Sequence, residues 1–149
     1  MLEAIRLSLE NVKKGGGPFG AVIVKKGKII SRGFNMVTAG NDPTAHAEIV
    51  AIRKASKKLK SFDLKGCEIY TSCEPCPMCL SAIYWANIEK IYFANTRGDA
   101  KKINFRDDHI YNELAKPLKK RKIPINQMLR KEALKAFELW EFIADKIPY

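Results

Sequence analysis

Features that would place a protein in a membrane or outside the cell are missing from this sequence. No apolar run among its 149 residues is long enough to cross a bilayer, so we expect no membrane partner. Acidic residues interrupt the apolar pattern of residues 1–14, which is not the pattern of a secretory signal. We therefore expect a cytoplasmic protein, in which closely spaced cysteines indicate a metal or redox site more often than disulfides.

Histidine and glutamine are scarce, with two histidines and the single glutamine Gln127, whereas lysine, glutamate and isoleucine are abundant, as in heat-adapted proteins. The net charge is +11. A basic surface would suit the phosphates of a nucleic acid. A lysine-rich, heat-adapted surface is the other interpretation, and the densest basic run, at 116–122, lies among prolines as a solvated loop would.

No repeat, linker or low-complexity tract is visible, and the length suits a single domain over residues 1–149. An amphipathic helix should come first, since apolar residues recur at helical spacing at Leu2, Ile5, Leu9 and Val12. A β-hairpin over 19–25 and 28–35 should follow. Further strands are expected at 67–71 and 90–94, and further helices at 43–58, 78–86, 107–115 and 130–144.

This order predicts an α/β fold with three layers, α-β-α, in which helices cover a mixed β-sheet that starts with an antiparallel hairpin. We expect Asp42 to cap the helix that begins at Pro43. The last helix should carry its apolar residues on one side, at Leu134, Phe137, Trp140 and Ala144.

Cys76 and Cys79 are three positions apart, so on a helix both sulfurs can reach one ion. The first turn of a helix favours thiolates, because its free N–H groups and its dipole stabilise negative charge. This suits Zn²⁺, and it equally suits a redox pair of the thioredoxin type. The pair alone leaves both interpretations open.

His46 and Glu48 favour zinc over the redox pair. Both are expected in the first turn of a helix, about 200° apart around it, so they converge only on an object that lies off the helix end. A zinc ion between two helix N-termini fits that geometry. Cys73 could complete a closed Cys₃His site, but Pro75 separates it from the helix, and such a site would leave Glu48 without a role. Three ligands with an open fourth position are the catalytic pattern.

The two motifs, His46-Ala47-Glu48 and Pro75-Cys76-Pro77-Met78-Cys79, resemble the H-x-E and P-C-x-x-C signature of zinc deaminases. The chain is therefore similar to the cytidine deaminase-like superfamily, and within it to the small bacterial guanine deaminases. The likeness covers nearly the whole chain. It runs through G-G-P-F-G-A-V-I-V at 16–24, N-D-P-T-A-H-A-E at 41–48, A-I-R-K-A at 51–55, Y-T-S-C-E-P-C-P-M-C-L at 70–80, A-I-Y-W-A at 82–86, I-Y at 110–111 and the terminal tyrosine.

The resemblance implies a hydrolase that converts guanine, a small purine, to xanthine and ammonia. His46, Cys76 and Cys79 would hold one Zn²⁺ per subunit. A zinc-bound hydroxide would attack C2 of the base, and Glu48 would carry the proton to the substrate and then to the departing amine.

Further roles are implied by the same likeness. Asp107 would lie near the substrate amino group. The substrate-binding residues would be Asn35, Phe19, Ala47, Trp85 and Tyr149. Tyr149 would cover the pocket of a neighbouring subunit, in a homodimer that exchanges C-terminal segments. Arg106, Ser81 and Pro148 depart from the usual family pattern.

The main alternative is a tRNA-specific adenosine deaminase, which converts adenosine to inosine at the wobble position and shares D-P-T-A-H-A-E and P-C-x-M-C. S-A-I-Y-W-A at 81–86 and N-F-R-D-D at 104–108 favour guanine over tRNA. Deamination of cytidine or deoxycytidylate is a further alternative. A non-catalytic, zinc-stabilised nucleic-acid binder is the interpretation from another class.

Overall fold

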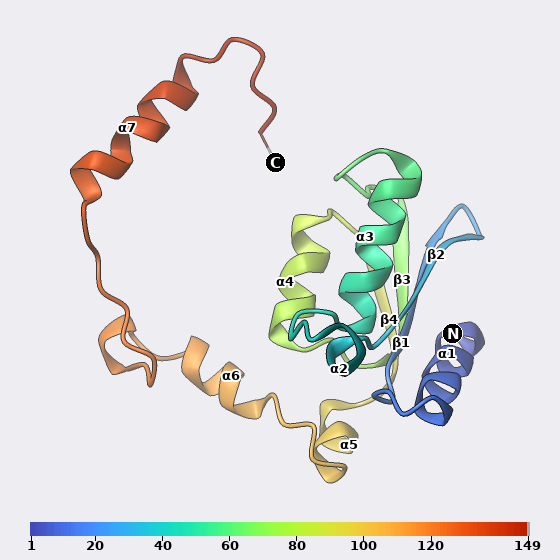
Figure 1. Cartoon of the computed structure of the whole chain (residues 1–149). Helices are drawn as coiled ribbons and strands as arrows, with labels where there is room; N and C mark the ends of the chain where they lie inside the picture. The colour runs from blue at the N-terminus through green and yellow to red at the C-terminus, as the bar shows by residue number, and fades with distance from the viewer. Residues whose placement is uncertain (149) are drawn as a thin grey trace. The chain divides into compact units, whose positions relative to one another are not determined.

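The computed structural model describes residues 1–148, and the chain divides into two compact units, with the boundary between Asp107 and Asp108. The elements of the first unit are α1 (Leu2–Lys13), β1 (Gly20–Lys25), β2 (Lys28–Phe34), α2 (Val37–Gly40), α3 (Ala47–Leu59), β3 (Cys67–Cys73), α4 (Pro77–Trp85), β4 (Lys90–Asn95) and α5 (Arg97–Lys102) (Figure 1). Those of the second unit are α6 (Asp108–Leu114), a 3₁₀ turn (Leu118–Lys120) and α7 (Arg130–Glu141).

Four strands form one sheet in the order β2-β1-β3-β4. β1 pairs antiparallel with β2 and with β3, whereas β3 and β4 run parallel, joined by α4. The register between β1 and β2 shifts between Ile23 and Val24. The predicted mixed sheet with its leading hairpin is confirmed.

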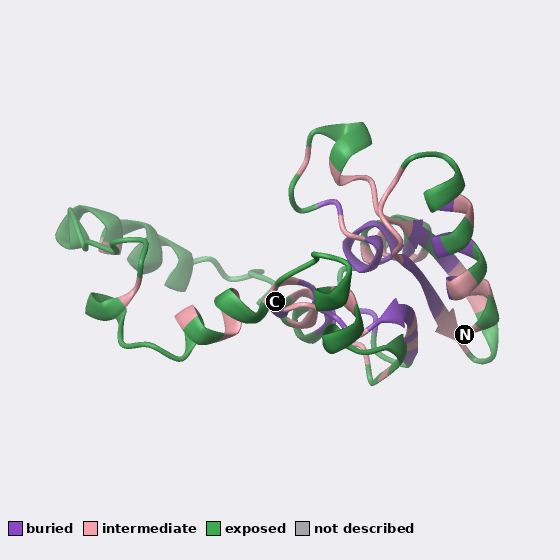
Figure 2. Cartoon of the chain, turned by 90° about the horizontal axis from the view of Figure 1, so that it is seen from below, coloured by how far each residue is buried: buried purple, intermediate pink, exposed green. Residues whose placement is uncertain are grey.

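Helices cover both faces of the sheet, as the three-layer prediction requires. α1 contacts one face, and α3 contacts the other, with α4 beside it (Figure 1). Alternate residues of β1 serve the two layers, as strand geometry dictates: Ala21 and Ile23 join the core beneath α3, and Val22 joins Ala4 and Leu7 of α1. The buried residues are concentrated in these layers (Figure 2).

The helix predicted at the start of the chain is confirmed, but the face expected to be buried was wrong. Ala4, Leu7, Ser8 and Asn11 face the sheet, whereas Leu2 is 84 % exposed and Leu9 60 % exposed. α1 lies so close to β1 that a Cβ on Gly20 would meet the carbonyl oxygen of Ala4 and the backbone nitrogen of Ser8. Small residues such as Ala4 and Ser8 permit this approach, so the buried face is the one that carries them together with Leu7.

The helix expected from Pro43 begins at Ala47 instead. The Asp42 carboxylate accepts hydrogen bonds from the backbone N–H of Thr44, at 2.8 Å, and from its hydroxyl, at 2.6 Å. This is a local Asx turn rather than a helix cap. His46 is consequently the N-cap residue of α3, and Glu48 is its second helical residue.

The remaining elements differ from the predictions at their ends and in two short additions. The sequence predicted neither α2 nor α5, and α5 has a capping box made by Thr96 and Asp99. The last helix ends at Glu141 rather than at Ala144. No described residue of the second unit is buried; on α7, Phe137 is 72 % exposed.

Gly33 sets the distance between β2 and α3. A Cβ at this position would overlap the carbonyl oxygen of Ala47 and lie 2.6 Å from the backbone nitrogen of Ala51. We expect Gly33→Ala to lower the free energy of unfolding by about 2–3 kcal/mol, because helix backbone rather than a flexible side chain must move. Urea unfolding measures this effect. Gly40→Ala is the matched control, because a Cβ there has no neighbour within 4 Å. Equal midpoints for the two variants would contradict the expectation.

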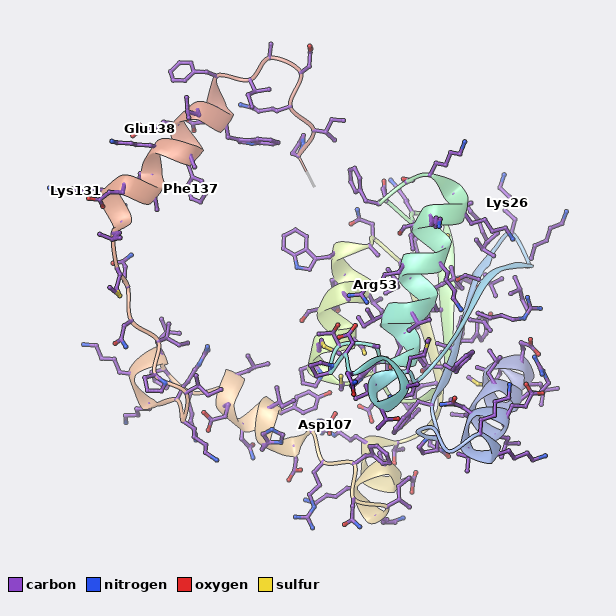
Figure 3. The ribbon with its side chains drawn as sticks, viewed as in Figure 1. Lys26, Arg53, Asp107, Lys131, Phe137 and Glu138 are labelled. Carbon is purple, nitrogen blue, oxygen red and sulfur yellow. The ribbon has the colours of Figure 1, made fainter. Side chains whose placement is uncertain are left out.

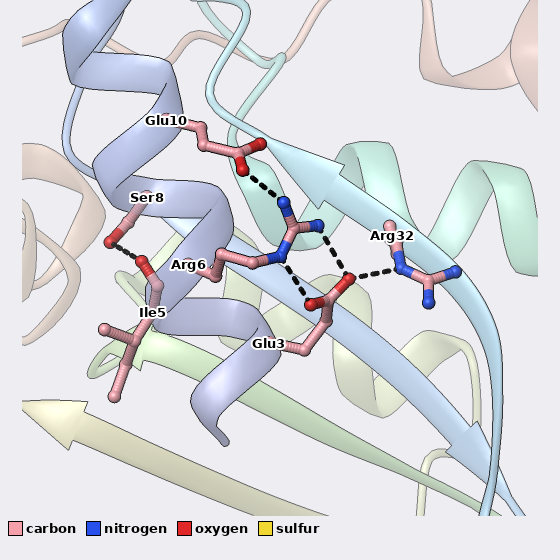
Figure 4. Close-up of polar contacts among 6 residues, drawn as sticks. All are labelled: Glu3, Ile5, Arg6, Ser8, Glu10 and Arg32. Atoms are coloured by element: carbon pink, nitrogen blue, oxygen red, sulfur yellow. Dashed lines mark hydrogen bonds and ion pairs between the residues drawn. The ribbon is translucent and has the colours of Figure 1, made fainter.

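Glu3 links α1 to β2 through a cluster of charges (Figure 4). Its carboxylate accepts hydrogen bonds from Arg6 Nε at 2.7 Å, Arg6 Nη2 at 2.9 Å and Arg32 Nε at 2.5 Å, and Arg6 also contacts Glu10. The hydrogen bonds from Arg6, and next those from Arg32, lower the pKa of Glu3 to about 2, from an ordinary value of 4.5.

A group whose pKa is lower in the folded state stabilises the fold above its unfolded pKa and loses that effect as the pH falls. We therefore expect Glu3→Gln to be less stable than the parent at pH 6. The difference should shrink progressively between about pH 5 and pH 2. Thermal unfolding of both proteins across this range checks it, and a difference that grows toward acid pH would contradict it. The effect should be small, because both arginines are half exposed.

Candidate metal centre and active site

Two helix N-termini present the potential metal ligands. His46 is the N-cap of α3 and Cys76 is the N-cap of α4, and both have extended backbone angles and leave the cap unoccupied by a side chain. Pro77 occupies the first turn of α4, where its missing N–H costs nothing. Each ligand therefore lies at the positive end of a helix, which favours negative charge on the thiols.

The three predicted ligands lie together. The ligand atoms of His46, Cys76 and Cys79 are within 4.8 Å of one another, and no other group of this kind occurs among residues 1–148. The Nδ1 atom of His46 is 3.6 Å from the sulfur of Cys76 and 3.5 Å from that of Cys79. Tetrahedral zinc, with bonds of 2.0–2.3 Å to nitrogen and sulfur, would separate such donors by roughly 3.5 Å.

The charges of this site suit a bound cation. Hydrogen bonding from the Cys79 thiol, and next from His46, lowers the pKa of Cys76 to about 4. The Cys76 thiolate and burial in turn raise the pKa of Cys79. The hydrogen bond to Cys76 also raises the pKa of His46. Two neighbouring sulfurs cannot both ionise without a positive charge between them, and a divalent ion would supply it.

Cys73 is not part of this group. Its thiol donates to the carbonyl oxygen of Thr96 at 3.6 Å, and burial raises its pKa to about 11. Cys67 is fully buried in the core beneath α3. The geometry thus favours an open site with three protein ligands over the closed Cys₃His alternative.

Glu48 is buried beside the ligands, with 8 % of its surface exposed. Desolvation raises the pKa of its carboxyl group above the ordinary value, and the nearby Cys76 thiolate acts in the same direction. A carboxyl group whose pKa is moved toward neutrality can both accept and return a proton. Ala47, between Glu48 and His46, is 1 % exposed.

Asn35 and Phe19 lie on two neighbouring loops. The N–H of Asn35 donates to the carbonyl oxygen of Phe19 at 3.1 Å, and the N–H of Met36 donates to that of Ala45 at 2.9 Å. The chain at Asn35 is therefore tied on one side to the loop that carries Phe19 and on the other to the residue that precedes His46. Within residues 1–148 the side-chain NH₂ of Asn35 makes no hydrogen bond, so it can donate to a ligand.

Asp107, which is labelled in Figure 3, is the last residue of the first unit and is partly buried. Burial raises the pKa of its carboxyl group, and the charges that act on it include that of Cys76. Phe105 forms an edge-to-face contact with Phe19, with ring centres 4.8 Å apart and planes at 88°. This contact, which the sequence did not reveal, joins the segment that leads to Asp107 to the loop that carries Phe19.

Two predicted residues are not placed in this group. Trp85 is the last residue of α4, about two and a half turns from Cys76, and is 67 % exposed. With Ser81 and Tyr84 it lines a separate hollow of about 380 Å³. Tyr149 lies outside the described residues. The roles predicted for both stay predictions.

The sequence interpretation missed Asn11, whose buried side chain reaches both loops. Two signals could have revealed it. The residues of α1 that are small or polar recur at helical spacing, and three glycines, Gly15–Gly17, follow the helix.

No helix among residues 1–148 is long and apolar enough to cross a membrane.

Comparison with known proteins agrees with this site. The family described as the cytidine and deoxycytidylate deaminase zinc-binding region matches residues 1–95. The chain belongs to this family. The match also decides between the two interpretations of the cysteine pair in favour of zinc, since the His-Cys-Cys group lies in that zinc-binding region.

Among individual proteins, the guanine deaminase of Bacillus subtilis is 52 % identical over 147 residues, which are 98 % of this chain and 94 % of that protein. The tRNA-specific adenosine deaminase of Aquifex aeolicus is 46 % identical, but over 61 % of this chain and 60 % of that one. The crystal structure of the B. subtilis guanine deaminase superposes with a TM-score of 0.96 at 51 % identity, covering 99 % of this chain and 95 % of the other. That of a guanine deaminase from Nitrosomonas europaea has a TM-score of 0.68 at 34 % identity, covering 70 % of this chain and 61 % of the other.

Proposed function

We propose that this chain is a zinc-dependent guanine deaminase, which hydrolyses guanine to xanthine and ammonia. The observation that carries the proposal is the extent of the similarity to the B. subtilis guanine deaminase, which covers 98 % of this chain, together with the His-Cys-Cys group next to a buried glutamate. The tRNA-specific adenosine deaminase of A. aeolicus is similar over 61 % of the chain.

His46, Cys76 and Cys79 would hold one zinc ion per subunit, because their donor atoms have the spacing and the chemical type that tetrahedral zinc prefers. A bound zinc ion would act as a Lewis acid that makes water a nucleophile at neutral pH. With only these three protein ligands, a bound zinc ion would have a position left for water.

Glu48 would move the protons of the reaction. Its carboxylate would take one proton from the attacking water and pass it to a ring nitrogen of the purine. It would then take the second proton from the new hydroxyl group at C2 and deliver it to the departing amino group, which leaves as ammonia. The raised pKa of Glu48 suits both steps, because the group must accept and donate within one turnover. The carbon at C2 gains the oxygen of water and loses ammonia, which balances the reaction.

Four further residues would hold the purine. The free NH₂ of Asn35 would donate to an acceptor on the base, and Phe19 and Ala47 would contact its faces and edge. Asp107 would accept a hydrogen bond from the amino group that leaves. The position of Phe19 next to Asn35 and Phe105 supports this arrangement.

The protein would act as a homodimer with exchanged C-terminal segments. Two observations support it. The second unit buries none of its described residues, and β4 is an exposed edge strand that pairs only with β3 among the described residues. A unit without a core and a sheet edge without a neighbour both need a partner surface. Trp85 and Tyr149 would then contact substrate in the assembled enzyme.

Residues 1–149 would act as one deaminase domain in the cytoplasm.

The experiment that tests the proposal supplies the zinc-loaded protein with several possible substrates. Guanine, guanosine, adenine, cytidine and an anticodon stem-loop that contains adenosine are incubated separately, and released ammonia is measured. Release from guanine alone supports the proposal. Release from the stem-loop alone would replace it with tRNA editing, and release from cytidine alone with pyrimidine deamination.

A further inference from the structure

We propose that Asn11 of α1 is a positioning residue for purine recognition: it sets the spacing between the loop that carries Phe19 and the loop that carries Asn35. The inference rests on the proposed function, since the two loops matter for catalysis only if they hold the base. Asn11 itself is not close to the metal ligands in the sequence, and nothing in the zinc-binding motifs points to it.

The side chain of Asn11 joins three segments. One hydrogen of its NH₂ group is donated to the carbonyl oxygen of Gly17 at 2.8 Å, and the other to the carbonyl oxygen of Asn35 at 2.9 Å. Asn11 is 6 % exposed, so these bonds form away from water. Both donors of the amide are used, and each ends on the backbone of a different loop.

Three glycines, Gly15–Gly17, follow α1 next to this contact. Gly15 has a φ of +81°, which turns the chain back toward the helix. A Cβ on Gly16 would lie 2.5–2.7 Å from the side-chain amide of Asn11, and one on Gly17 would lie 3.2 Å from the side chain of Asn35. Any larger residue at 16 would displace Asn11, so the room that this amide needs explains the glycine at position 16.

A backbone hydrogen bond connects the segment that carries Asn35 to the residue before His46. Asn35 is followed by Met36, whose N–H donates to the carbonyl oxygen of Ala45, and His46 comes next. The N–H of Val37 also donates to the side-chain oxygen of Asn35 at 3.3 Å, which directs the free NH₂ of that side chain. Loss of the Asn11 amide therefore releases the backbone on which Asn35 stands, while the two cysteine ligands keep their own helix.

Two variants of Asn11 test this role. Asn11→Ala removes both donors, and Asn11→Asp keeps the shape but turns two attractive contacts with carbonyl oxygens into repulsive ones. We expect kcat/KM for guanine to fall about 10- to 100-fold in Asn11→Ala, mostly through KM, with the zinc content unchanged. Asn11→Asp should fall at least as far, although it fills the same space.

The matched controls lie on the same face of the same helix. Ser8 is buried and donates only to Ile5 within α1, so Ser8→Ala should leave KM unchanged (Figure 4). Leu7→Ala should lower stability by about 2–4 kcal/mol through lost core contacts, again without a change in KM below its unfolding temperature. If the destabilised control Leu7→Ala also raised KM, the effect of Asn11→Ala on KM would reflect lost stability, and Asn11 would be merely structural.

Amide hydrogen exchange supplies a readout that does not depend on activity. In Asn11→Ala, the N–H groups of Phe19, Asn35 and Val37 should exchange faster, because they belong to the two released loops. Unchanged exchange at these amides would overturn the inference, and so would an unchanged KM in an active variant. If the parent protein releases no ammonia from guanine, the proposed function fails, and the exchange result alone decides whether Asn11 holds the loops.

Discussion

Replacement of Glu48 by glutamine is expected to abolish turnover while leaving the protein folded and its zinc in place. Glutamine has nearly the same shape as glutamate but cannot take a proton from water or deliver one to a leaving amine. General acid–base catalysis of this kind contributes about 10²- to 10⁴-fold, and Glu48 would act in more than one proton transfer. We therefore expect kcat for guanine to fall at least about 10³-fold. Ammonia release under saturating guanine is the measurement.

The same variant should be at least as stable as the parent. Burial disfavours the charged form of Glu48, so a neutral amide in its place removes that cost. Metal analysis should find the parental zinc content. Glu68→Gln is the control, because that carboxylate contacts Lys90 and Tyr70 on the sheet and no predicted site residue. A Glu48→Gln protein with parental kcat would show that another group carries the protons.

Loss of one zinc ligand should have the second large effect. Cys79→Ser removes a sulfur that is fully buried and 3.5 Å from the imidazole of His46, leaving two good ligands for the ion. We expect the variant to purify with little zinc and without measurable activity. Bound zinc stabilises the fold by about 4 kcal/mol when its free concentration is 1,000 times its Kd, so the unfolding temperature should fall as well.

Cys73→Ser is the decisive comparison for this prediction. Cys73 donates to a backbone carbonyl rather than joining the group of ligands, and serine can make the same hydrogen bond. This variant should therefore keep its zinc and most of its activity. Metal analysis, ammonia release and thermal unfolding are measured in parallel for both variants. If Cys73→Ser lost its zinc as Cys79→Ser does, the site would have four protein ligands and no open position for water.

The three predicted ligands lie together in the structure because their placement depends on local geometry. The spacing of Cys76 and Cys79 by three residues places both sulfurs at one helix start, whatever the rest of the fold does. His46 lies 30 residues away, but it too precedes a helix, and the open ends of two helices have the same preference for ligands of this type. The mixed sheet was predictable for a similar reason, since the alternation of strands and helices limits the possible topologies.

The buried face of α1 was not predictable from local spacing. Apolar residues at Leu2, Ile5, Leu9 and Val12 indicated one buried face, and the structure buries another, which contains Ala4, Ser8 and Asn11. The cause is the close approach of the helix to Gly20 on β1, a contact between residues that the pattern of α1 alone does not contain. The start of α3 was misplaced for a comparable reason, because the hydrogen bonds that Thr44 donates to the Asp42 carboxylate hold a turn where a helix was expected.

The sequence by itself thus determined the class of protein, a zinc-binding deaminase. It also predicted which residues would lie together at the two helix starts, because that grouping follows from residue types at short spacing. Only the tertiary structure decided which side of α1 faces the sheet and that Asn11 joins the two loops. Those outcomes depend on distances between segments far apart in the chain. Such distances are set by close packing and by buried hydrogen bonds, which no short-range pattern records.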